Sequence, residues 1–63
     1  MTFVEVQELF GTTNIPGSPQ ELEVLRHWTE ELVSRKGEKY VRKYRKRLYR
    51  VWLFILQMGL TRV

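Results

Sequence analysis

The longest regular pattern of apolar and polar positions lies in the C-terminal half of the chain. Apolar residues recur there at intervals of three and four residues, which is the spacing of a helix that packs along one side. This pattern predicts one uninterrupted helix over residues 38–58. Its apolar stripe consists of Val41, Tyr44, Leu48, Val51, Ile55 and Met58.

The predicted helix changes character along its length. Between Val51 and Met58 only Gln57 is polar, so the last two turns are apolar on all sides. A helix that is apolar all round is normally buried all round. Because a chain of 63 residues offers little else to cover it, we expect a second copy of the chain to do so. The predicted self-association or partner interface consists of Leu48, Val51, Trp52, Phe54, Ile55 and Met58.

A second helix, acidic in composition, is predicted over residues 19–36. Ser18 followed by Pro19, with Glu21 three residues after the serine, is typical of a capped helix start. We expect Gly37 to end this helix and to turn the chain into an antiparallel hairpin with residues 38–58, because the two apolar stripes are out of register. The alternative is one continuous helix through Gly37, at a cost of about 1 kcal/mol relative to alanine.

The N-terminal part of the chain predicts a short helix over residues 3–10. Thr2 and Glu5 have the spacing of a capping box. The sequence at the start of this segment is also rich in β-forming residues, so a strand is the competing interpretation. Residues 11–18 contain two glycines and a proline and are expected to form a connector, from which only Ile15 reaches the core.

Together these elements predict an all-α fold. The chain forms a single small domain over residues 1–63, with a short N-terminal helix and a long antiparallel helical hairpin. A domain below about 70–80 residues usually adds disulfides, a metal or an oligomer interface. The sequence has no cysteine, no aspartate and one histidine. We therefore expect no metal and no cofactor, and a homodimer that completes a helical bundle.

Charge divides the chain into two unlike parts. Residues 1–33 carry a net charge of −5, whereas residues 34–63 carry +9. The candidate contact residues for a polyanion form the basic face of the predicted helix 38–58: Lys39, Arg42, Lys43, Lys46, Arg47 and Arg50. The ridge from Lys39 to Arg50 is expected to run about 16 Å along the helix.

Three interpretations of this basic face remain open. It contacts the phosphates of DNA or RNA, it is solvated or paired with the glutamates of the acidic half, or it meets an anionic membrane surface. We favour the first interpretation. Most of the neighbouring aromatic residues fall beside the apolar stripe, where packing is expected. Tyr49 lies on the other flank, and it is the one aromatic residue worth testing for stacking on a base, although a packing contact is the favoured role.

Catalytic chemistry is not indicated. His27 has no second histidine or cysteine as a partner, and Ser18 is already explained as a helix cap. Glu30 and Glu31 are adjacent in sequence, so they point in different directions on a helix. We also expect no signal peptide, no transmembrane segment and a cytoplasmic location. The sequence therefore predicts a small, non-enzymatic nucleic-acid-binding accessory or regulatory protein. The alternative is an interaction module that docks a protein partner through its C-terminal apolar helix surface.

Overall fold

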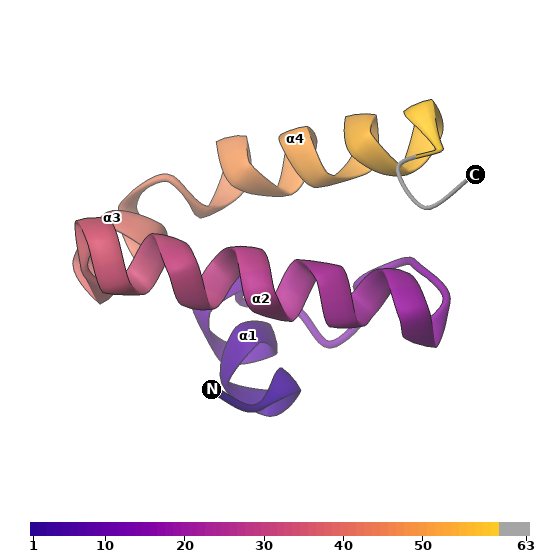
Figure 1. The fold of residues 1–63 in the computed structure, drawn as a ribbon. Coiled ribbons are helices and arrows are strands. Elements are labelled where there is room, and N and C mark those ends of the chain that lie inside the picture. The colour runs from indigo at the N-terminus through magenta and orange to yellow at the C-terminus, as the bar shows by residue number, and fades with distance from the viewer. Residues whose placement is uncertain (60–63) are drawn as a thin grey trace.

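The computed structural model describes residues 1–59, and all the regular secondary structure in this range is helical. No strand occurs in this range, so the predicted all-α class is confirmed, and residues 3–10 are a helix (Figure 1). The helices are α1 (Phe3–Phe10), α2 (Pro19–Lys36), α3 (Glu38–Lys43) and α4 (Arg45–Met58).

Both predicted capping boxes are present at the starts of α1 and α2. The Glu5 backbone N–H donates to the Thr2 hydroxyl at 3.3 Å, and the Thr2 N–H donates to the Glu5 carboxylate at 3.1 Å. Ser18 and Glu21 make the same reciprocal pair at 3.2 and 2.8 Å. Each box satisfies backbone N–H groups that have no partner within the helix.

Glycine sets the end of two of the predicted elements. Gly11 ends α1 with φ 71°, a left-handed conformation that costs other residues more. Gly37 separates α2 from α3 with φ 93° and ψ 159°. The continuous helix through Gly37 is therefore excluded.

The uninterrupted helix predicted over residues 38–58 is wrong. It is broken at Tyr44, which has φ −105° and ψ 17°, into α3 and α4. Helix α1 contacts α2, α3 and α4, and the break lets both α3 and α4 pack against it. The first turn of α4 is formed by Arg45, Lys46 and Arg47, with no side-chain cap and no acidic residue. Three cations there oppose the helix dipole, so tertiary packing has to stabilise this start.

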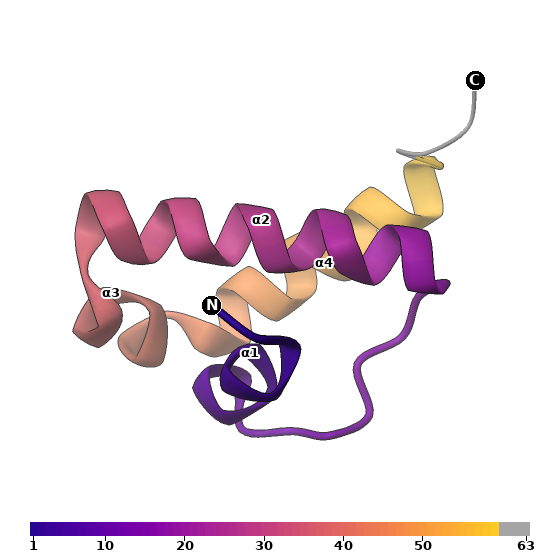
Figure 2. The ribbon, with the colours of Figure 1, turned by 60° about the horizontal axis from the view of Figure 1, so that its bottom comes forward.

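The break also replaces the long hairpin with a more open arrangement. Helix α3 packs against α2 and α1, whereas α4 makes its main helix contacts with α1 and α3. Figure 1 shows α4 running back along one side of α2, and Figure 2 shows that it crosses α2 obliquely. The predicted pairing of two long, straight helices is therefore not confirmed.

The core lies between α1, the connector, α2 and α4. Trp52 is only 1% exposed, and its indole N–H donates to the Pro16 carbonyl oxygen at 3.1 Å. Thr29 is the buried polar residue of α2, and its hydroxyl donates to the Leu25 carbonyl oxygen at 2.8 Å. The central cluster consists of Val6, Phe10, Ile15, Leu25 and Trp52. The expected burial of Ile15 is thus confirmed.

Candidate nucleic-acid interface

The six predicted phosphate-contacting residues are all exposed, but they do not form one straight ridge. The break at Tyr44 divides them between two helices. Lys39, Arg42 and Lys43 belong to α3, and Lys46, Arg47 and Arg50 belong to α4. The predicted basic ridge is therefore corrected to two basic segments that meet at the break.

Five cations around this break line one shallow hollow. Its volume is about 440 Å³, and it is lined by Arg42, Lys43, Tyr44, Arg45, Lys46 and Arg47. The prediction omitted Arg45, because in a continuous helix it falls between the basic and the packed sides. Its place inside the basic run at residues 42–50 was the available signal. We call the exposed cations of α3 and α4 other than Arg42, which pairs with Glu38, the basic surface: Lys39, Lys43, Arg45, Lys46, Arg47 and Arg50.

Little of this charge is compensated within the protein. On α2 the ion pairs are local: Arg26 pairs with Glu23 and Glu30, and Arg35 pairs with Glu31. Arg42 pairs with Glu38 of its own helix at 3.1 Å. Among residues 1–59 no cation of the basic surface forms an ion pair. Within residues 1–59 no glutamate of the acidic half pairs with the predicted basic face, and the partner of Arg42, Glu38, belongs to the basic half itself.

Glutamates of α2 pair instead with the N-terminal ammonium and with arginines of α2 itself. The terminal ammonium of Met1 donates to the Glu30 carboxylate at 2.8 Å, and Arg26 lies 3.5 Å from the same oxygen. The hydrogen bond from the ammonium, with its charge, lowers the pKa of Glu30 below its ordinary value. The hydrogen bonds from Arg26 similarly lower the pKa of Glu23.

These pKa shifts predict a loss of stability in acid. A carboxylate whose pKa is lower in the folded state stabilises the protein above its unfolded pKa, about 4.3 for glutamate, and loses this effect as the pH falls through the folded value. The melting temperature should therefore fall between about pH 5 and about pH 3. Glu30→Gln should show a smaller fall, because it removes one of the titrating groups. Thermal melts followed by circular dichroism test this, and an equal fall in both proteins would contradict it.

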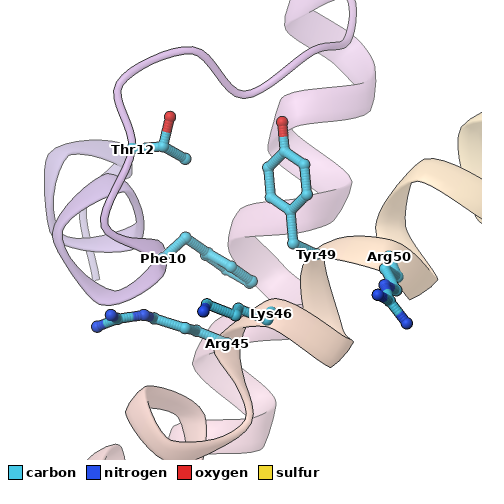
Figure 3. A pocket seen from close by; sticks show the side chains of 6 residues that line it. All are labelled: Phe10, Thr12, Arg45, Lys46, Tyr49 and Arg50. Carbon is cyan, nitrogen blue, oxygen red and sulfur yellow. The ribbon is translucent and has the colours of Figure 1, made fainter.

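A second hollow lies between the end of α1 and α4 (Figure 3). Its volume is about 460 Å³, and it is lined by Phe10, Thr12, Arg45, Lys46, Tyr49 and Arg50. The Phe10 and Tyr49 rings meet edge to face with their centroids 6.4 Å apart. The Tyr49 hydroxyl also donates to the Asn14 carbonyl oxygen at 3.3 Å. Tyr49 is thus a half-buried packing residue, as favoured, and it also lines the hollow.

The predicted self-association interface needs one correction. Trp52 is a core residue, because its indole is the largest fully buried side chain among residues 1–59. Leu48 and Ile55 are half-buried and pack against the core cluster. The exposed fractions of Val51, Phe54 and Met58 are 39%, 62% and 71%. We call Val51, Phe54 and Met58 the apolar stripe of α4, since their spacing of three and four residues places them on one side of the helix.

Other classes of site receive no support from the described residues. His27 is exposed and lies 3.3 Å from a Glu23 carboxylate oxygen. Within residues 1–59 no group of three or more histidine, cysteine, aspartate or glutamate side chains is placed to hold a metal ion. In the same range no helix is long and apolar enough to cross a bilayer.

No protein-family model matches the sequence, and neither the curated proteins nor the solved structures contain a match.

Proposed function

We propose that this protein binds nucleic acid through the phosphate backbone, using the basic surface of α3 and α4. The observation that carries the proposal is the uncompensated charge: of the seven exposed cations on these two adjoining helices, only Arg42 forms an ion pair with a glutamate of residues 1–59. An array of this kind attracts a polyanion, because each neutralised phosphate releases a condensed counterion.

The mode of contact follows from the residue types. Arginine guanidinium groups donate two parallel hydrogen bonds to a phosphate, and lysine supplies a point charge. The hollow at the break presents cations from both α3 and α4, which suits contact with several successive phosphates. Phosphate contacts position a protein on nucleic acid but carry no sequence information. We therefore expect binding that depends little on sequence.

The experiment is a salt titration with a matched pair of variants. Wild-type affinity, measured by fluorescence anisotropy on a labelled duplex, should fall steeply with salt. Lys43/Lys46→Ala should make the slope of log affinity against log salt shallower by about 1.8, because each phosphate that a lysine neutralises contributes about 0.9 to the slope. Arg35/Lys36→Ala removes the same formal charge from the end of α2 and should change the slope much less.

Two results would contradict this proposal. The first is no binding of DNA or RNA at low salt by a protein whose circular dichroism shows it to be folded. The second is an equal decrease of slope in the two double variants, which would mean that net charge, and not the basic surface, drives the attraction.

The apolar stripe of α4 supports a second candidate function. Large exposed apolar side chains grouped on one helix face are typical of an interface with another protein. A neighbouring hollow of about 340 Å³, lined by Tyr40, Tyr44, Arg47, Leu48 and Val51, shares Val51 with this stripe. We propose that the stripe joins two copies of the chain as a homodimer that completes a helical bundle, with a different protein partner as the competing occupant.

A further inference from the structure

We infer that the hollow between the end of α1 and α4 receives one unpaired base of a single-stranded nucleic acid, while Arg45 and Lys46 contact the phosphates beside it. This inference rests on the proposed function and adds to it a preference for nucleotides whose bases are free to leave the stack. Phosphate contacts at the basic surface do not by themselves require a base.

The lining of the hollow has the two components that a nucleotide needs. Aromatic rings come from Phe10 on α1 and Tyr49 on α4, and cations come from Arg45, Lys46 and Arg50 on α4. Figure 3 shows Arg45 and Lys46 lying along one side of the Phe10 ring, with Arg50 turned away beyond Tyr49. Bases stack on aromatic side chains while a cationic groove follows the backbone in single-strand binding proteins. The hollow thus places the half-buried Tyr49 ring beside positive charge, and Phe10, which is 7% exposed, supports that ring from behind through the edge-to-face contact.

The aromatic side of the hollow is held in place before any ligand binds. Tyr49 is fixed at its ring by the edge-to-face contact with Phe10 and at its hydroxyl by the bond to Asn14. Phe10 belongs to the buried core cluster and is only 7% exposed. A ring that is already ordered loses little side-chain entropy when a base stacks on it.

The cationic side is positioned by the end of α1. The Arg45 guanidinium lies against Gly11, because a Cβ built on that glycine would be 3.9 Å from the Arg45 Cζ, Nε and Nη1 atoms. The last turn of α1 has no basic residue of its own. A cation at a helix C-terminus is favoured by the helix dipole. Arg45 is therefore drawn towards the mouth of the hollow instead of extending freely into solvent.

A single strand fits this lining better than a duplex does. In a duplex the faces of the bases are stacked on one another, so a protein that reaches only the backbone meets phosphate and sugar. In single-stranded nucleic acid the bases can turn outward and stack on aromatic side chains. A base that has turned outward can reach the Tyr49 ring in the hollow, whereas a base stacked inside a duplex cannot.

The test compares two labelled oligomers of equal length and equal charge. One is oligo-deoxythymidylate, and the other has the same phosphodiester backbone with abasic residues throughout. We expect the wild-type protein to bind the thymidylate oligomer at least about fivefold more tightly, which is the low end of the gain from stacking one base. This comparison needs no substitution and therefore does not depend on the folding of a variant.

Two substitutions of Tyr49 locate the effect. Tyr49→Phe keeps the ring and removes the bond to Asn14, so the preference for the thymidylate oligomer should remain. Tyr49→Leu removes the ring and should lower the preference towards one, while the salt dependence on the abasic oligomer stays as in the wild type.

The outcomes separate this inference from the proposed function. Equal affinity of the wild type for the two oligomers overturns the base site and leaves phosphate binding intact. No binding of either oligomer at low salt overturns both. A preference that persists unchanged in a folded Tyr49→Leu variant also overturns the inference, because the base would then be bound elsewhere.

Discussion

Trp52→Ala should remove a large share of the protein's free energy of unfolding. The Trp52 side chain is 1% exposed and belongs to the core cluster formed by α1, the connector, α2 and α4. Truncation of a buried tryptophan or phenylalanine to alanine typically costs about 3–5 kcal/mol. Stabilities of about 0.05–0.15 kcal/mol per residue imply about 3–9 kcal/mol for a domain of 63 residues, so the variant should unfold at a much lower urea concentration than the wild type.

A neighbouring residue provides the matched control. Leu53 follows Trp52 on α4 but is 42% exposed, so Leu53→Ala should cost less than about 1 kcal/mol. Trp52→Phe should fall between the two, because it keeps an aromatic ring in the core and loses the hydrogen bond to Pro16. Urea denaturation followed by circular dichroism measures the free energy of unfolding of all three variants. Similar midpoints for Trp52→Ala and Leu53→Ala would contradict the core position of the indole.

The parts of the fold that the sequence predicted correctly depend on local chemistry. Thr2 with Glu5 and Ser18 with Glu21 form their capping boxes from side chains three residues apart, so neighbouring sequence is enough to specify them. Gly11 likewise ends α1 by its own backbone preference. Such signals fix where helices begin and end, and they do not depend on how the helices pack.

The break at Tyr44 had no such local signal. No glycine or proline lies between residues 38 and 58, and the apolar spacing continues through Tyr44 without a change of period. The break accompanies the packing of both α3 and α4 against α1, which is a tertiary feature that no residue near Tyr44 encodes by itself. Helix propensity is a weak preference that tertiary context overrides.

The packed side of α4 was mispredicted for a different reason. Where a helix is apolar all round, periodicity alone does not tell which side faces the core. The predicted stripe included Val51 and Met58, both of which are exposed, while Trp52 and its hydrogen bond to Pro16 occupy the interior. The bulky indole also carries an N–H that needs a partner when buried, and the connector supplies one.

The candidate interface was therefore predictable in its residues but not in its shape. The exposure of the six predicted phosphate-contacting cations followed from their positions opposite the predicted apolar stripe of residues 41–58. Their arrangement around the break, and the inclusion of Arg45, depend on where Tyr44 interrupts the helix. The hollow beside Tyr49 joins α4 to the end of α1, and no pattern within one helix predicts such a contact.

Phe54→Gln/Met58→Gln should convert the proposed homodimer into a folded monomer. These side chains are 62% and 71% exposed in the single chain, so their replacement leaves the core intact. In a twofold dimer each substitution acts twice. Because burying a large apolar side chain contributes about 1.5–3 kcal/mol, the dissociation constant should rise by about a hundredfold or more. Sedimentation velocity over a range of concentrations measures this change.

Val4→Gln is the matched control, because Val4 is an apolar side chain of α1 that is 60% exposed and lies outside the apolar stripe. It should leave the dimer unchanged. A wild-type protein that sediments as a monomer at millimolar concentration would exclude the homodimer and leave the stripe to a partner of different sequence.

Salt should act on the dimer and on nucleic-acid binding in opposite directions. Arg47 lines the hollow that adjoins the apolar stripe of α4, so in the proposed homodimer the Arg47 side chains of the two copies would lie at the same interface, where like charges repel. Added salt screens this repulsion and should strengthen the dimer, while it weakens phosphate binding by counterion release. A bound polyanion would also screen the repulsion, so nucleic acid at low salt should favour the dimer. If nucleic acid instead releases monomers, the basic surface and the apolar stripe compete for the same side of α4.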